Sequence, residues 1–193
     1  MSQLNLSCES IMQRLIGILI TCFIGIAYQV NPAVADSELG ILHQARIGLL
    51  KHDPALWAKH SKEEGVDLNL NVVFNYDVVD LIGGTIRPYA GTSLSLSGDT
   101  SRFHAGLVWQ YTVGPVFLDL GLGATVHNGR LESPGPDRKA LGSRVLFHIP
   151  VEVGFVVDTH SRIGVYFEHS SNCHLAEPNP GIDAIGLRYT YQF

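Results

Sequence analysis

The chain has 193 residues, a length that suits a single domain. Acidic residues outnumber basic ones, with 18 Asp and Glu against 13 Lys and Arg and a formal net charge of −5. The sequence has no basic block, no cluster of aromatic and Arg residues and no phosphate-binding loop, which argues against nucleic acid as a partner.

The N-terminal stretch has the features of a secretory signal peptide. Arg14 precedes an apolar run from Leu15 to Ala27, and Ala33-Val34-Ala35 then supplies a cleavage site with small residues at both ends. A membrane anchor is the competing interpretation, but this run is shorter than the ~20 residues that a spanning helix needs. We therefore predict a signal peptide over 1–35 and a mature domain over 36–193.

Beyond the signal peptide, apolar and polar residues alternate, which is the pattern of strands with one apolar face. Leu68 and Leu70, for example, alternate with Asp67 and Asn69. In chain order, we expect strands near 39–50, 66–76, 86–97, 103–113, 116–126, 145–157, 161–171 and 183–193.

The connections between these strands differ in length. Tight turns are expected at Gly98-Asp99, Gly114-Pro115 and Thr159-His160. Longer connections are expected near 52–65, 77–85, 129–142 and 172–182. Short turns that alternate with long loops are typical of outer-membrane barrels, in which the turns are periplasmic and the loops external.

The less apolar face of the strands distinguishes a barrel from a soluble sandwich. A face in contact with water would be rich in Lys and Glu, whereas this one has Gly, Ser, Thr and Asn with isolated charges such as Asp67, Glu152 and Arg188. These residues suit the narrow interior of a closed barrel. We therefore predict an all-β fold, an eight-stranded antiparallel up-and-down transmembrane β-barrel in the outer membrane of a Gram-negative bacterium. A lipocalin-like secreted barrel is the alternative.

The final hairpin holds the most informative residues. Apolar residues occupy the odd positions of the strand 161–171, so odd positions mark its outer face. His169 and Ser171 share this parity, and Asp183 has it on the next strand. Because neighbouring strands run antiparallel, we expect the three side chains to meet on one patch of the outer wall. If both termini are periplasmic, this patch lies at the outer leaflet of the membrane.

A serine, a histidine and a carboxylate together suit ester hydrolysis. A serine hydroxyl is a weak nucleophile until a neighbouring imidazole accepts its proton. A carboxylate bonded to the other ring nitrogen fixes the tautomer and stabilises the imidazolium. The alternative is that His169, Ser171 and Asp183 are ordinary polar residues of a barrel rim.

The C-terminal stretch resembles the signature of the lipid A 3-O-deacylase (PagL) family. That signature is His-x-Ser-Asn, a short loop, Asn-x-Gly and an acidic residue at the start of the last strand. It reads here as His169-Ser170-Ser171-Asn172, then Asn179-Pro180-Gly181, then Asp183, within a close match over about 168–193. The resemblance implies an eight-stranded outer-membrane barrel in which Ser171 is the nucleophile, His169 the general base and Asp183 the orienting acid. The family pattern usually has Glu where this chain has Asp183.

Further site residues follow less directly from the sequence. An oxyanion hole needs hydrogen-bond donors near the attacked carbonyl, which makes Asn172, Asn179 and Gly181 candidates. The even parity of Asn172 points its side chain inward, and Asn179-Pro180-Gly181 is also ordinary turn chemistry. His104, His127 and His148 are scattered along the chain without metal-ligand spacing. We therefore expect no metal site, and ester hydrolysis by serine requires no cofactor.

Residues and resemblance together predict an outer-membrane serine esterase that modifies lipopolysaccharide. Its substrate and partner would be lipid A, from which it would hydrolyse the 3-O-linked acyl chain, and a homodimer stays open. A non-enzymatic barrel that acts as an adhesin or structural protein is the main alternative. An acyltransferase is a further one, but it would need an enclosed acyl pocket, and the polar interior positions argue against that pocket.

Overall fold

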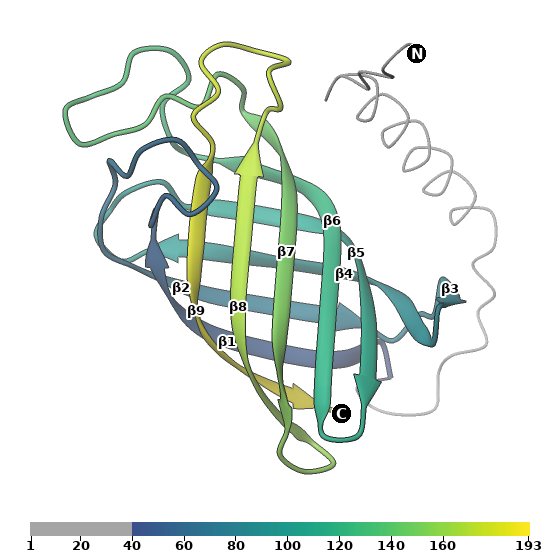
Figure 1. Cartoon of the computed structure of the whole chain (residues 1–193). Helices are drawn as coiled ribbons and strands as arrows, with labels where there is room; N and C mark the ends of the chain where they lie inside the picture. Colours follow the sequence, from purple (N-terminus) through teal and green to yellow (C-terminus); the bar gives the residue numbers. More distant parts are fainter. Residues whose placement is uncertain (1–39) are drawn as a thin grey trace, which may run out of the picture.

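The computed structural model describes residues 40–193, so the predicted signal peptide over 1–35 lies outside the described residues. In this range the chain forms nine β-strands (Figure 1). They are β1 (Leu42–His52), β2 (Val66–Phe74), β3 (Val79–Leu81), β4 (Gly84–Ser95), β5 (Arg102–Val113), β6 (Val116–His127), β7 (Val145–Val156), β8 (Ser161–Ser171) and β9 (Ile182–Gln192). No helix between residues 40 and 193 is long and apolar enough to cross a membrane.

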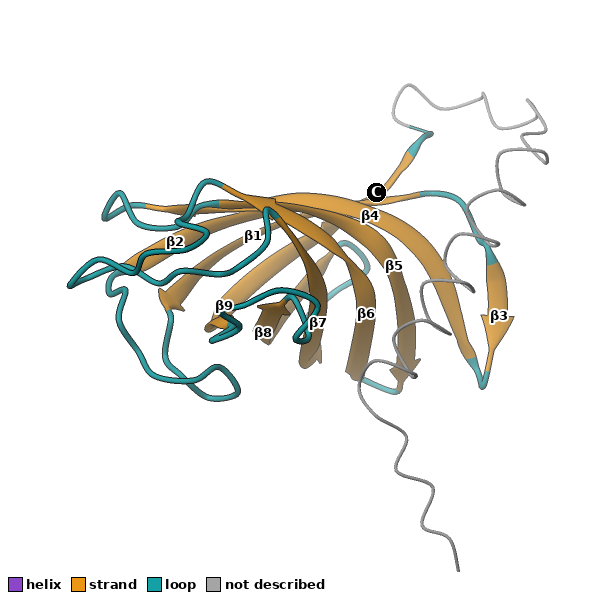
Figure 2. Cartoon of the chain, turned by 90° about the horizontal axis from the view of Figure 1, so that it is seen from above, coloured by secondary structure: helices purple, strands orange, loops and turns teal. Residues whose placement is uncertain are grey.

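The strands form one antiparallel sheet that closes on itself. Their order is β2-β1-β9-β8-β7-β6-β5-β4-β3, and β2 also pairs with β4. This last pairing closes a ring of eight strands that curves around a common interior (Figure 2). The predicted eight-stranded antiparallel barrel is therefore confirmed. The short strand β3 was not predicted, and it pairs with β4 outside the ring.

The connections are less regular than the sequence suggested. The loops 53–65, 128–144 and 172–181 lie at one end of the barrel, at the top of Figure 1. The tight turn Gly98-Asp99 joins β4 to β5 at this same end, whereas the 77–85 connection lies at the opposite end. The expected alternation of short turns and long loops is wrong at these two connections. The 77–85 segment folds back as the β3–β4 hairpin, in which Val79 pairs with Ile86.

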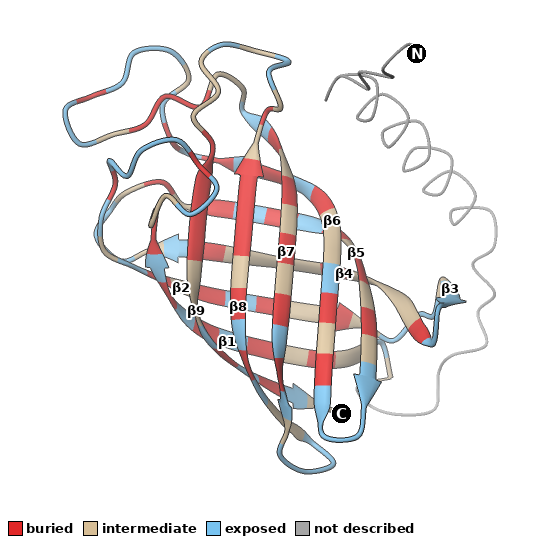
Figure 3. Ribbon diagram, viewed as in Figure 1, coloured by how far each residue is buried: buried red, intermediate tan, exposed pale blue. Residues whose placement is uncertain are grey.

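Polar and charged side chains fill the barrel interior, as the alternation predicted. Figure 3 shows buried residues alternating with exposed ones along the strands. Buried ion pairs cross the interior between Arg46 and Asp119 at 2.5 Å, between Arg102 and Asp67 at 2.7 Å, and between Arg188 and Glu152. A cavity beside Tyr166 measures about 10 Å³, hardly enough for one water molecule. Side chains therefore pack the lumen at this level.

The outer wall is apolar and exposed. Leu49 and Leu187, for example, leave 60% and 66% of their surface uncovered. A continuous apolar wall of this kind marks a surface that meets another apolar phase. Aromatic side chains gather on this wall toward the end opposite the long loops, where the rings of Trp109 and Tyr111 stack and those of Tyr191 and Phe193 meet edge to face. Such aromatic residues are typical of a membrane interface.

Candidate active site on the outer wall

The pairing of β8 with β9 brings His169 and Asp183 together. The two residues lie directly opposite each other in the register of the two strands. Side chains in such positions start about 5 Å apart at their Cβ atoms, which is within reach of a hydrogen bond. His169 Nδ1 lies 2.7 Å from Asp183 Oδ1. An aspartate at the position where the family pattern has glutamate thus reaches the imidazole directly.

Ser171 completes the group from the end of β8. It lies two residues beyond His169, so the pleat of the strand turns both side chains to the same face. Ser171 Oγ is 3.1 Å from His169 Nε2. A carboxylate, an imidazole and a hydroxyl therefore form one hydrogen-bonded line on the outer wall, at the end of the barrel that has the long loops.

The loop 53–65 covers this group from outside. The Trp57 ring stacks on the His169 ring, with centroids 4.6 Å apart and planes 21° from parallel. The backbone N–H groups of Trp57 and Ala58 donate to Asp183 Oδ2 at 2.7 and 2.8 Å. One carboxylate oxygen thus bonds the loop and the other bonds His169, so that the loop fixes the carboxylate in place.

This cover interrupts the alternation of buried and exposed residues. Residues 168–170 and 182–184 are buried in succession, which Figure 3 shows as continuous red at the upper ends of β8 and β9. His169 is 6% exposed and Asp183 is fully buried, although both point outward. Sequence reasoning missed Trp57, because nothing in a polar loop indicates which strand it will cover.

Gly181 allows the 172–181 loop to pass close to His169. Its φ of +68° lies in the left-handed region that favours glycine. A Cβ at this position would come within 2.9 Å of His169 Cε1. Any larger residue would therefore push against the imidazole as well as strain the backbone.

Asn172 holds the 172–181 loop in place. Its side-chain amide donates to the carbonyls of Leu141 and Pro178 at 2.9 and 3.1 Å, so both amide protons are engaged. Its backbone N–H donates to Asn179 Oδ1 at 3.2 Å. The side chain of Asn172 is buried against these loop carbonyls and is 2% exposed. In this arrangement it organises the loop next to Ser171 rather than facing the hydroxyl.

A buried ion pair joins the site loop to its neighbours. Lys139 Nζ lies 2.5 Å from Asp53 Oδ1 and donates to the carbonyl of Gly181 at 3.0 Å. Burial raises the pKa of Asp53, against the hydrogen bonds from Lys139 and from the Lys62 N–H, which favour its charged form. The loops 53–65, 128–144 and 172–181 are thus linked through one ammonium group.

Glu63 joins the same loops to the β4–β5 turn. Its carboxylate accepts hydrogen bonds from the backbone N–H groups of Lys139 and Thr100, and from the Thr100 hydroxyl. It also contacts His52 Nε2 at 3.0 Å. Burial disfavours the charged form of Glu63, but these hydrogen bonds outweigh it and lower the pKa of Glu63 to about 2.

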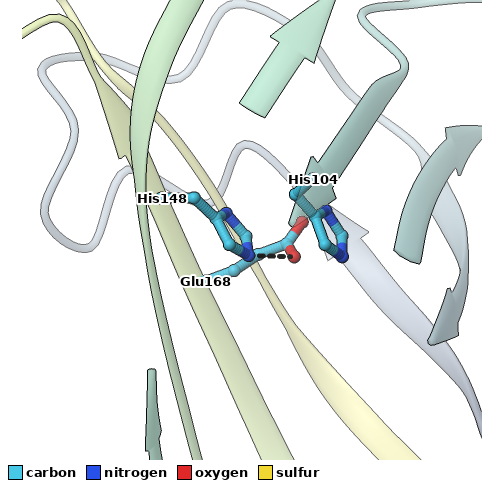
Figure 4. Close-up of side chains that lie close together, drawn as sticks. All are labelled: His104, His148 and Glu168. Carbon is cyan, nitrogen blue, oxygen red and sulfur yellow. Dashed lines mark ion pairs between the residues drawn. The ribbon is translucent and has the colours of Figure 1, made fainter. Parts of the chain in front are cut away.

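A second polar cluster, formed by His104, His148 and Glu168, lies inside the barrel. The sequence had indicated that these two histidines are scattered along the chain. Figure 4 shows the rings of His104 and His148 face to face with the Glu168 carboxylate beside them. One ligand atom from each residue lies within 4.8 Å of the others. The two rings are 4.3 Å apart and only 8° from parallel, so their lone pairs run side by side instead of converging. A shared metal ion would require one ring to turn.

Comparisons with known proteins point to one family. Residues 55–192, which include the outer-wall group, match the family model for lipid A 3-O-deacylase (PagL). Lipid A deacylase PagL of Bordetella bronchiseptica is 37% identical over 97 residues, which cover 46% of this chain and 52% of that protein. The match therefore spans about half the length of this curated relative.

A solved structure shows the same fold. The crystal structure of the outer membrane enzyme PagL superposes with a TM-score of 0.55 and 19% sequence identity, covering 78% of this chain and 99% of the other. The family match covers more than half of the sequence and contains His169, Ser171 and Asp183. The chain is therefore a member of the lipid A 3-O-deacylase (PagL) family and an outer-membrane β-barrel.

Proposed function

We propose that this protein hydrolyses the 3-O-linked acyl chain of lipid A, with Ser171 as nucleophile, His169 as general base and Asp183 as orienting acid. The observation that carries the proposal is the unbroken line of hydrogen bonds from Asp183 through His169 to Ser171, on a wall that faces lipid. A lipid substrate reaches such a site by lateral diffusion in the outer leaflet, without leaving the membrane.

The reaction follows from the two ends of the imidazole. Ser171 Oγ attacks the ester carbonyl while His169 Nε2 takes its proton. Asp183 accepts a hydrogen bond from Nδ1–H and stabilises the imidazolium that forms. The bond from the carbonyl carbon to the sugar oxygen then breaks, and His169 returns its proton to that oxygen. Water, deprotonated by His169, then attacks the acyl carbonyl. The bond from that carbon to Ser171 Oγ breaks, His169 returns the proton to Oγ, and the fatty acid leaves.

The negative oxygen of the tetrahedral intermediate needs donors close to Ser171. Asn172, Asn179 and Gly181 remain the proposed group, since all belong to the 172–181 loop that lies against His169 and Ser171. Both amide protons of Asn172 are engaged by loop carbonyls, so this side chain would serve only after a shift of the loop. The backbone N–H of Asn172 is likewise engaged, by Asn179 Oδ1 at 3.2 Å.

Mass spectrometry of lipid A tests the proposal in a host that lacks the activity. Expression of the natural chain should remove one 3-hydroxyacyl group from lipid A, and Ser171→Ala should abolish the loss. Ser170→Ala is the matched control, because Ser170 is the preceding residue and points into the lumen toward His148. Unchanged lipid A with the natural chain correctly inserted would contradict the proposal and favour a non-enzymatic adhesin or structural barrel.

A further inference from the structure

Three loops at one end of the barrel, 53–65, 128–144 and 172–181, line a cavity of about 190 Å³ beyond the strand ends. Loop 53–65 contributes Lys59, His60 and Lys62 to its lining, and loop 172–181 contributes Pro178 and Pro180. The cavity thus combines basic side chains from one loop with rigid apolar rings from another. All of its lining residues lie outside the strands.

The cavity adjoins the candidate active site through one short segment of chain. The backbone N–H of Lys59 donates to the carbonyl of Pro180 at 2.7 Å, which fixes Lys59 beside the site loop. Two residues earlier, Trp57 stacks on His169. Neighbours two apart in an extended chain are at most ~7 Å apart, so the two sites are close enough for one headgroup to span them.

The charge in this cavity is not balanced by the protein. Lys59 and Lys62 are exposed, and in the part of the chain described, residues 40–193, neither forms an ion pair. Lys139 also lines the cavity, but its ammonium group is buried and paired with Asp53. The two exposed ammonium groups are therefore the cations available to a ligand, and lysine is a common point-charge partner of phosphate.

We propose that this cavity binds a phosphate group on the sugar headgroup of the substrate and thereby positions the neighbouring ester at Ser171. The inference rests on the proposed function, because lipid A is a phosphorylated glycolipid. The acyl chains stay against the apolar outer wall, while Lys59 and Lys62 hold the phosphate above it. The cavity sets the affinity for phosphorylated substrate rather than the rate of the chemical step.

The test compares lipid A with enzymatically dephosphorylated lipid A in mixed detergent micelles. For the double variant Lys59→Gln/Lys62→Gln, KM for phosphorylated lipid A should rise about tenfold with little change in kcat, because uniform binding is lost. The dephosphorylated substrate should show no difference between variant and natural protein. Arg130→Gln is the matched control, since Arg130 is an exposed cation on loop 128–144 that does not itself line the cavity.

Three results would overturn the inference. The first is an unchanged KM in the double variant. The second is an equal rise in KM for the phosphorylated and the dephosphorylated substrate. The third is the same rise in KM in Arg130→Gln, which would indicate an effect of general surface charge. Inorganic phosphate separates the two sources of the anion. If it competes only at concentrations far above those of lipid A, the headgroup is the ligand, whereas competition at equal concentration would show a site for free phosphate.

Binding to Ser171→Ala keeps the two proposals distinguishable. This variant should bind phosphorylated lipid A more tightly than the dephosphorylated form, and the lysine substitutions should remove the difference. If that preference holds while the natural protein releases no fatty acid, the proposed function fails and the cavity remains a phosphate site. If fatty acid is released without any preference for phosphate, the cavity proposal fails alone.

Discussion

Two clusters with similar residue types lie on opposite sides of the same barrel wall. On the outside, Ser171, His169 and Asp183 form a continuous line with distances of 3.1 and 2.7 Å. On the inside, Ser170 Oγ lies 3.2 Å from His148 Nδ1, and His148 Nε2 lies 3.8 Å from Glu168 Oε2. Each cluster thus contains a serine, a histidine and a carboxylate.

The partners of the carboxylates distinguish the two clusters. Glu168 accepts hydrogen bonds from Ser93 and Tyr166 and pairs with Arg102 at 3.0 Å, so its charge neutralises a buried guanidinium. Asp183 bonds His169 and two backbone N–H groups. The inner cluster is closed off from any ester by the packed lumen, whereas Ser171 of the outer cluster stays partly exposed on the outer wall. Residue types alone therefore do not define a catalytic group. A catalytic group also needs a continuous line of hydrogen bonds and access to the substrate.

The largest effect is expected from Asp183→Asn. An amide in this position favours the wrong imidazole tautomer, so kcat should fall by roughly 10³–10⁴-fold, as in other serine triads. Asp183→Glu should retain most of the activity, because the family pattern accepts glutamate. Steady-state hydrolysis of lipid A measures both variants. Equal activity of the asparagine variant and the natural protein would assign Asp183 to structure alone.

Glu168→Gln should act on stability rather than on catalysis. Loss of this charge leaves Arg102 with Asp67 as its remaining anionic partner in the lumen, and breaking such a buried pair costs on the order of 3 kcal/mol. Urea unfolding in detergent should show a lower free energy of unfolding for the variant, while the folded variant keeps its kcat. A fall in kcat as large as that of Asp183→Asn would mean that the inner cluster takes part in the reaction.

Trp57→Ala should have a smaller effect on the outer cluster. Removal of the ring uncovers His169 to water and loosens the loop that bonds Asp183, so kcat should fall about tenfold. Trp57→Phe should retain most of the natural kcat, because a phenyl ring also stacks on imidazole. Leu56→Ala is the control, since Leu56 is an exposed neighbour on the same loop. Similar losses in the Trp57→Ala and Leu56→Ala variants would contradict a specific role for the stack.

The smallest effect concerns pH. The pKa of Glu63 falls from 4.5 to about 2 on folding, so ionised Glu63 contributes stability that is complete above about 4.5 and lost as pH falls toward 2. Loop 53–65 should therefore loosen over this range. Trp57 fluorescence in a Trp109→Phe background reports it. The Glu63→Gln variant should show a looser loop near neutral pH and a weaker acid transition, and an identical titration would contradict the assignment.

The side of the wall that each residue faces was predictable from the sequence. Parity along a strand is a local property, so it placed His169 and Ser171 outside and Glu152 inside without knowledge of the fold. The same alternation located the strands, but β1 (Leu42–His52) and β4 (Gly84–Ser95) are shifted from the expected 39–50 and 86–97. The roles of Ser171 and Asp183 came from the resemblance and stay predictions.

Contacts between distant segments were not predictable in this way. His104 and His148 meet only because β5 and β7 flank β6, where they pair with Thr125 and Gly123, and this depends on how the sheet pairs. Trp57 reaches His169 because a loop folds over the wall, and no periodic pattern marks that contact. The β3 hairpin likewise depends on a few pairs with β4.

Covalent labelling with a fluorophosphonate probe tests the central claim most directly. The proposed role of Ser171 as activated nucleophile predicts that peptide mass spectrometry of the inserted, natural protein will find the adduct on Ser171. Labelling should disappear in His169→Ala and persist in His148→Ala. An adduct on Ser170, or Ser171 labelling that survives the loss of His169, would contradict the account.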